Sequence, residues 1–369
     1  MKTEETAGRG MGRQIRERAA FLVFKQALAE GRGFLEGEGV MTQNAIDLGT
    51  FITWEHGENY PFSACMKKLM EVLGADQGLY TYGFFAGLSG DDFIMCYGNN
   101  GLYNDCVSVC EDAETFLART FGRIGLHYEL ASPAQWKRDP EALKKKLQSF
   151  IDRGVPVLVK GAMRKGMNFD LAFAYEENGE VFSVTCGDPK HNQTCRLSES
   201  GSAFIFIDSL PQIEDIARVY RESMLQIPQL MRARTASGVD FGANAYRRWA
   251  DDLENGRYES LIPEEFESWG DWCVFVCNLA TNARHGADFL ARAYVYNPDM
   301  PGILRFLALL DRNEDLWREL ERLGTGLNVT LEALQNPDMR RKTVETIRRF
   351  IPLNQQMERE LTQRRDGVN

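Results

Sequence analysis

Asn168-Phe-Asp-Leu-Ala-Phe-Ala-Tyr175 is the stretch that decides the fold of this chain. It belongs to a series of runs that are rich in β-branched and aromatic residues and are separated by turn residues. The neighbouring runs are Gly154–Val159, Val181–Val184 and Ser202–Ile207, and the turn residues include Glu176–Gly179 and Gly187–Pro189. Such a pattern predicts strands, and Asn178-Gly179 is typical of a hairpin turn. We therefore expect these four strands to lie in one largely antiparallel sheet.

Helical segments surround the predicted strands. In the first part of the chain they are expected at 111–121, at 141–153 and from Pro61 or Ser63 to Leu73, where Gly74 stops the helix. After Pro211 the sequence has a helical period and few strand signals. Helices are expected there at 212–234, 242–254, 263–281, 286–295, 301–323, 330–335 and 338–364. The expected fold class is α+β, with an N-terminal helix and linker (1–40), an antiparallel sheet with a central helix (41–209) and an all-α helical domain (210–369).

The overall charge excludes one class of partner. The chain has 43 basic and 53 acidic residues and a formal net charge of -10, which is the opposite of the basic surface that binds nucleic acid. No segment is long enough to span a bilayer. The apolar run Ala19–Phe24 is shorter than a signal-peptide core and is followed directly by Lys25. We therefore expect a cytoplasmic protein with no nucleic-acid or membrane partner, and a homo-oligomer is left open.

The eight cysteines are expected to be free thiols, because a large chain without an export signal resides in a reducing compartment. Two pairs, Cys106/Cys110 and Cys273/Cys277, have a spacing that places both thiols on one face of a helix. A four-thiolate zinc site is conceivable, but its usual signature has a shorter gap. The favoured interpretation is small buried apolar residues, with no metal and no cofactor.

The order of the predicted strands resembles the C-terminal half of a papain-like domain. The type is that of the bacteriocin-processing cysteine peptidases and of the N-terminal domain of the butirosin acyltransferase family. In those proteins a Gly-x-Pro-Val strand precedes a strand that opens with the catalytic His, and Gly-Tyr, a turn and a strand ending in Asp-Pro follow. The resemblance covers about residues 44–209. After Pro211, the segment Gly242–Leu253 resembles a helix found behind such domains in bacterial proteins, with Tyr246 and Trp249 as core contacts.

The resemblance implies a degenerate catalytic triad. The slot of the catalytic His holds Asn168, which cannot take up a proton near neutral pH. Asp188 matches the Asp-Pro of the family and, with Asn168, can only complete a hydrogen-bond network. His191 follows in a polar loop that can fold back over the cleft, where we count it as a ligand-binding candidate.

Two registers remain open for the nucleophile. Cys65 lies near the start of the 63–73 helix, where unpaired N–H groups and the helix dipole stabilise a thiolate. Asn59, six residues earlier, has the offset at which papain-like enzymes place an oxyanion donor. Counting back from Gly74 instead places Pro61 in the nucleophile slot. Cys65 would then be a buried thiol one turn deeper in the helix.

Gly87-Leu-Ser-Gly-Asp-Asp-Phe93 resembles the glycine-rich loop that lines the cleft of the butirosin-type domain. By this resemblance Gly87, Ser89, Gly90 and Asp91 are ligand-binding candidates, since glycines let N–H groups approach a ligand. A tight turn that leads into a strand is the alternative.

Three functions stay open at this point. The leading hypothesis is a papain-like protein with a degenerate triad that binds a small molecule or peptide. The alternative is a thiol-dependent peptidase, amidase or acyltransferase that uses Cys65 with a displaced base. A purely structural or assembly role is the third. Exposure of Cys65 beside a His or a carboxylate separates the first two.

Overall fold

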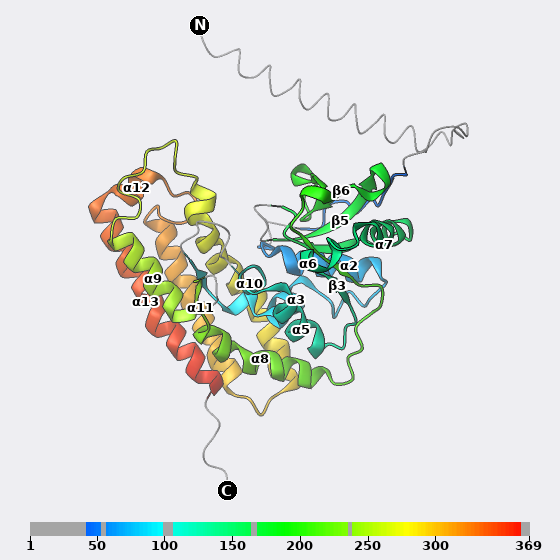
Figure 1. The fold of residues 1–369 in the computed structure, drawn as a ribbon. Helices are drawn as coiled ribbons and strands as arrows, with labels where there is room; N and C mark the ends of the chain where they lie inside the picture. The colour runs from blue at the N-terminus through cyan, green and yellow to red at the C-terminus, as the bar shows by residue number, and fades with distance from the viewer. Residues whose placement is uncertain (1–41, 53–56, 99–105, 164–167, 235–237, 363–369) are drawn as a thin grey trace, which may run out of the picture. The chain divides into compact units, whose positions relative to one another are not determined.

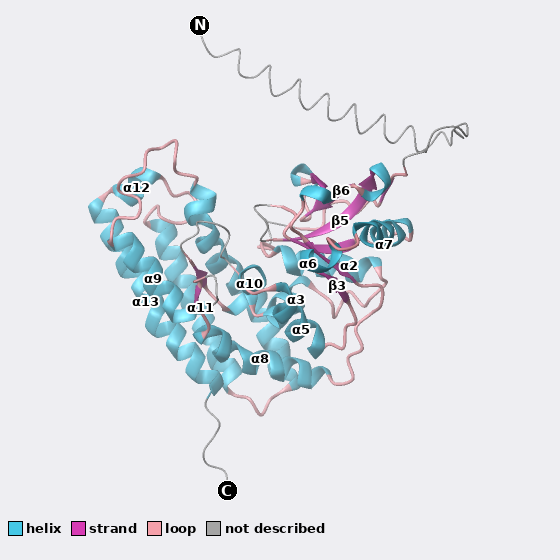
Figure 2. Ribbon diagram, viewed as in Figure 1, coloured by secondary structure: helices cyan, strands magenta, loops and turns pink. Residues whose placement is uncertain are grey.

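Seven strands form one sheet in which every pairing is antiparallel (Figure 2). The computed structural model describes residues 42–52, 57–98, 106–163, 168–234 and 238–362. The strands are β1 (Asn44–Ala45), β3 (Glu129–Ala131), β4 (Val157–Lys160), β5 (Phe169–Glu176), β6 (Val181–Thr185), β7 (Gln193–Arg196) and β8 (Ala203–Phe206). Their order is β3-β8-β4-β5-β6-β7, and β1 pairs with β5. The four strands expected from the sequence are all present, so the prediction of an α+β fold with an antiparallel sheet is confirmed.

Helices cover both faces of this sheet. Successive side chains of a strand point to opposite faces, so apolar residues on both faces pack against helices. Leu158 of β4 and Phe169 of β5 belong to the core that includes α2 (Pro61–Val72). Val157 of β4 belongs to a separate core with α7 (Pro140–Asp152). Figure 1 shows α2 and α7 beside β5, and both helices contact that strand.

The ends of α2 follow directly from the sequence. Pro61 occupies its first turn, where the missing N–H group costs nothing. Gly74 follows the last turn with a φ of 78°, a conformation in which glycine has no Cβ clash. The rings of Phe62 and Phe169 meet edge to face with centroids 5.0 Å apart. The predicted packing of the central helix on the sheet is therefore confirmed.

The expected glycine-rich loop is mostly helical, and this part of the prediction was wrong. Residues Tyr82–Ser89 form α3, which begins where Thr81 Oγ1 accepts a hydrogen bond from the Phe84 N–H at 3.1 Å. Gly90, with a φ of 95°, ends the helix, and Asp91–Phe93 adds a single 3-10 turn. The sequence pattern missed α3 because all but one of its residues are buried, so it has no polar face to reveal its period.

Helices dominate the chain after β8. They are α8 (Ile216–Arg232), α9 (Gly242–Glu254), α10 (Val274–Tyr296), α11 (Gly302–Arg322), α12 (Leu331–Gln335) and α13 (Pro337–Thr362), and shorter helices α4 (Val107–Cys110), α5 (Ala113–Arg123) and α6 (Pro133–Trp136) precede β4. Figure 1 shows α9 and α11 beside α13, which contacts both.

The two helices expected at 263–281 and 286–295 are largely one helix, α10, which runs through Gly286. A Cβ at Gly286 would lie 3.0 Å from the ring of Phe93. The glycine therefore permits close packing on the 3-10 turn and does not end the helix.

A two-stranded sheet connects the sheet region with the helices that follow. Its strands are β2 (Cys96–Tyr97) and β9 (Asp240–Phe241), from opposite sides of the expected boundary at Pro211. The described residues from Thr42 onward group into one compact unit. The helix and linker expected within 1–40 lie outside the described residues. Among the described residues, no helix has both the length and the apolar character needed to cross a membrane.

Candidate functional site

The start of α2 lies against the start of β5, which is where the resemblance placed the catalytic centre. Cys65, in the second turn of α2, is fully buried, and its Sγ lies 3.8 Å from the carbonyl oxygen of Phe169. Burial raises the pKa of the Cys65 thiol well above its ordinary value, and the charge of Asp170 adds to this. Cys65 is therefore a protonated core thiol near neutral pH.

Asn168 immediately precedes β5 and is buried. Its backbone carbonyl accepts a hydrogen bond from the Gly161 N–H at 2.9 Å. Asp188 caps the turn that follows β6, where its Oδ1 accepts a hydrogen bond from the Lys190 N–H at 3.0 Å and its Oδ2 lies 3.6 Å from His191 Nδ1. Within the described part of the chain, no hydrogen bond joins Asn168 to Asp188. The structure thus places Asp188 beside His191 and joins the backbone of Asn168 to Gly161.

The segment before α2 is held by α10. The side-chain amide of Asn59 donates a hydrogen bond to Thr281 Oγ1, and the Tyr60 hydroxyl donates to Asn278 Oδ1 at 2.5 Å. The Tyr60 N–H in turn donates to the Tyr82 hydroxyl oxygen at 2.8 Å. Asn59, which was expected to serve as an oxyanion donor, therefore binds the C-terminal helical part of the chain.

The four candidates of the predicted glycine-rich loop are buried in contacts within the protein. A Cβ at Gly87 would lie 2.2 Å from the ring of Phe289, and one at Gly90 would lie 2.8 Å from Leu230. Ser89 Oγ donates to Asp91 Oδ2 at 2.9 Å, and Asp91 Oδ1 accepts the N–H of Ser108, also at 2.9 Å. These glycines give α8 and α10 room to approach, and Asp91 anchors the chain at the start of α4.

A pocket of about 320 Å³ opens beside this region, between α2, α3, α8 and α10. Its lining includes the ion pair of Lys67 Nζ, on a partly exposed side chain, with Oε1 of the buried Glu58, and the two atoms are 2.9 Å apart. From α10 it receives His285, whose ring packs edge to face on Tyr82 with centroids 4.7 Å apart. Two acidic and two basic groups therefore share one small cavity once Asp288 and Arg292 are included.

Asp288 and Arg292 of α10 form the outer side of this pocket. Arg292 donates to the carbonyl oxygen of Gly78 at 2.9 Å, and its charge acts on the Tyr220 hydroxyl group. Asp288 is exposed and makes no ion pair with another described residue. Sequence reasoning missed this set, although His285, Asp288 and Arg292 follow one another at helical spacing and so lie on one face.

Asp92 is a buried carboxyl group close to the pocket wall. It is fully buried, and neither of its side-chain oxygens has a hydrogen-bond partner among the described residues. Burial raises the pKa of Asp92 well above its ordinary value, and the charges of Asp91 and Asp288 add to this. Asp92 is therefore expected to be protonated well above the usual pKa of an aspartate.

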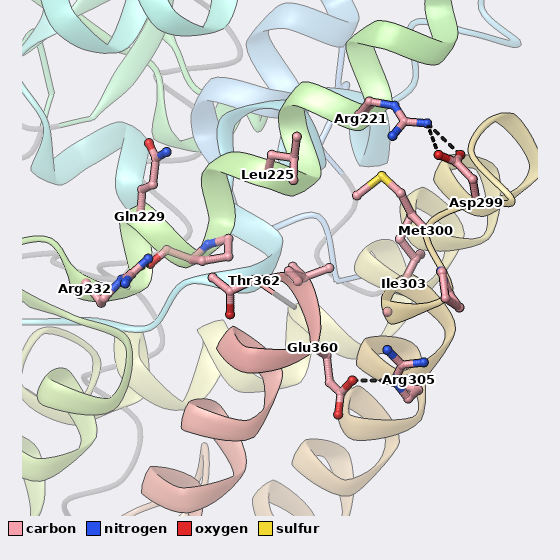
Figure 3. A pocket seen from close by; sticks show the side chains of 14 residues that line it. Arg221, Leu225, Gln229, Arg232, Asp299, Met300, Ile303, Arg305, Glu360 and Thr362 are labelled. Carbon is pink, nitrogen blue, oxygen red and sulfur yellow. Dashed lines mark hydrogen bonds and ion pairs between the residues drawn. The ribbon is translucent and has the colours of Figure 1, made fainter. Parts of the chain in front are cut away.

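A larger pocket of about 850 Å³ lies between α8, the start of α11 and the end of α13 (Figure 3). Its arginines are already paired with acids. Arg221 Nη2 lies 2.6 Å from Asp299 Oδ1, and Arg305 pairs with Glu360. Its arginine charges are thus balanced by carboxylates of the protein, and none of the site residues predicted from the sequence lines it.

Comparison with known proteins found no family model and no curated protein that matches this chain.

Proposed function

We propose that this chain is a papain-like-fold protein with a degenerate catalytic centre, and that it binds a small zwitterion, such as an amino acid, in the pocket beside α2. The observation that carries the first part is the environment of Cys65. A working thiol nucleophile needs exposure and a neighbouring base, whereas Cys65 is fully buried against a backbone carbonyl. The contact of α2 with Phe169, the residue that follows Asn168, supports the papain-like arrangement with its base replaced.

The charges of the pocket support a zwitterionic ligand. Asp288 is exposed, has no ion-pair partner among the described residues and can receive an ammonium group. Arg292 supplies positive charge for a carboxylate. Phe84 and Tyr220 provide an aromatic wall for an apolar side chain. The volume of about 320 Å³ is near the lower limit for small-molecule sites, which favours one amino acid over a length of peptide.

Binding of amino acids, measured by isothermal titration calorimetry, tests the proposal. A hydrogen bond to a charged group contributes about 1.5–3 kcal/mol, so Asp288→Asn and Arg292→Gln should each weaken binding by roughly tenfold to a hundredfold. Asp338→Asn, at an exposed position at the start of α13, is the matched control and should leave binding unchanged. Equal affinities in all variants, or no binding of any amino acid, would reject this ligand class.

Alkylation of the native protein tests the degenerate centre independently. At neutral pH a thiol-directed reagent should label the partly exposed Cys110 and Cys195 before Cys65. The competing hypothesis, a thiol peptidase, amidase or acyltransferase, requires preferential labelling of Cys65 and turnover that Cys65→Ser abolishes. Those two results together would replace our proposal with the enzyme.

A further inference from the structure

The pocket beside α2 contains an ion pair that the amino and carboxylate groups of the proposed ligand do not use. Lys67 lies on α2, Glu58 lies in the segment before it, and both line the pocket. Lys67 Nζ is 2.9 Å from Glu58 Oε1. Opposite charges at this distance compensate each other. The pair therefore adds no net charge to the pocket, but it adds a strong donor and a strong acceptor.

The donor side of this pair is incompletely used by the protein. An ammonium group has three N–H donors. Within the described part of the chain, the Lys67 ammonium group donates to Glu58 alone. The side chain of Lys67 is 32% exposed and that of Glu58 only 8%. Lys67 is thus the more accessible partner, and two of its donors remain for a ligand. The Glu58 carboxylate can accept several hydrogen bonds while it holds Lys67.

The charge balance of the pair restricts the ligand group that can bind there. A ligand carboxylate would lie beside Glu58, whose charge already compensates Lys67, and the two carboxylates would repel each other. A ligand ammonium group would face the N–H donors and the charge of Lys67. A carboxamide is neutral and has both functions: its oxygen accepts from Lys67, and its NH₂ group donates to Glu58.

The rest of the pocket suits an amide on a short apolar stem. Phe84 and Tyr220 line it, with their rings edge to face and centroids 6.1 Å apart, and they offer an apolar surface to methylene groups. α10 contributes Asp288 and Arg292, whereas the ion pair comes from α2 and the segment before it. Separate segments of the chain therefore face the two ends of an amino acid.

We propose that the ligand is an amino acid with a carboxamide side chain, glutamine or asparagine, and that the Lys67–Glu58 pair determines this specificity. The inference rests on the proposed function, because it assumes that Asp288 and Arg292 hold the amino and carboxylate groups. A site that hydrogen-bonds a polar group of its ligand discriminates against an analogue that lacks the group, since the buried polar atoms of the site then stay unpaired.

Isothermal titration calorimetry of the full chain tests the specificity. Glutamine is compared with glutamate and with methionine, which has a similar size and no amide, and asparagine is compared with aspartate and leucine. We expect the better-binding amide to exceed both its acid and its apolar analogue by roughly tenfold to a hundredfold in affinity.

Three variants connect the preference to the ion pair. In Glu58→Gln the charge of Lys67 is uncompensated, so the acid should bind more tightly than the amide; a reversed order cannot arise from a loss of folding. Glu58→Gln combined with Lys67→Met removes the pair without leaving a buried charge, and the amide should then bind no better than its apolar analogue. Glu71→Gln combined with Lys68→Met is the matched control. That pair is also 2.9 Å apart and involves α2, but it does not line the pocket, so the preference should persist.

The outcomes separate this inference from the proposed function. Binding of these amino acids without a preference for an amide would overturn the inference and leave the zwitterion site in place. An amide preference that persists in Glu58→Gln, or that disappears in the Lys68 and Glu71 control, would also overturn it. No binding of any of the six amino acids would reject the proposed function and the inference together.

Discussion

Replacement of Gly87 by Ala should destabilise the protein, because this glycine lets α10 pack against α3. A Cβ at position 87 would lie 2.2 Å from Cγ and Cδ2 of Phe289. Carbon atoms pack at about 3.5–4.0 Å, so the ring must move by roughly 1 Å or more. Rotation of the ring cannot relieve a clash at Cγ. The ring is only 2% exposed, and it packs on Tyr220 with centroids 4.9 Å apart and on Phe93 at 5.9 Å.

The expected magnitude is the difference between two opposing effects. Overpacking of a core costs about 1–3 kcal/mol, and the enclosed ring of Phe289 places this site near the upper end. Replacement of a helical glycine by alanine stabilises the helix by about 1 kcal/mol through helix propensity. The free energy of unfolding should therefore fall by about 2 kcal/mol in Gly87→Ala. In Gly122→Ala, on α5, a Cβ has no atom within 4 Å, and we expect a gain of about 0.5–1 kcal/mol.

Urea unfolding, followed by circular dichroism and by fluorescence, measures both free energies. In a Phe289→Ala background the ring is absent. There Gly87→Ala should raise the free energy of unfolding instead of lowering it, by an amount similar to that of Gly122→Ala. Equal free energies of unfolding for Gly87→Ala and Gly122→Ala in the parent protein would refute the packing argument. A penalty that persists in the Phe289→Ala background would do so as well.

Three further predictions concern Asp92, Asp91 and the two family slots at Asn168 and Pro61. Asp92→Asn should raise the free energy of unfolding at neutral pH and flatten its pH dependence. Burial raises the pKa of Asp92 in the folded state. The contribution of Asp92 to the free energy of unfolding is therefore fully present below its unfolded pKa of about 3.9, and it is lost as the pH rises through the pKa of the folded state. Urea titrations at several pH values check this, and a profile identical to that of the parent would contradict it. Asp91→Asn, which disturbs two hydrogen bonds, should instead cost about 1–3 kcal/mol. Combining Asn168→His with Pro61→Cys and assaying activated thioesters tests the papain-like register. Activity confined to the double variant supports a lost triad, whereas activity of the parent that depends on Cys65 rejects it.

Much of the sheet could be predicted because its signals are local. The hairpin turn before β6 is present, with φ values of 55° at Asn178 and 85° at Gly179, as the Asn-Gly pair indicated. The stop of α2 before Gly74 is a local signal of the same kind. In each case the residues that determine the conformation are adjacent in the chain, so a single sequence is enough to identify them.

The tertiary structure alone decided the remaining features. α3 has no polar face because it is buried among other helices, and α10 continues through Gly286 because Phe93 packs there. The pocket joins Lys67 with Arg292, which are more than 200 residues apart. The burial of Cys65 likewise depends on the packing of α2 against β5. The sequence determines which side chains are present. Their burial and their proximity arise only when distant segments pack, and burial and proximity determine which side chains can react or bind.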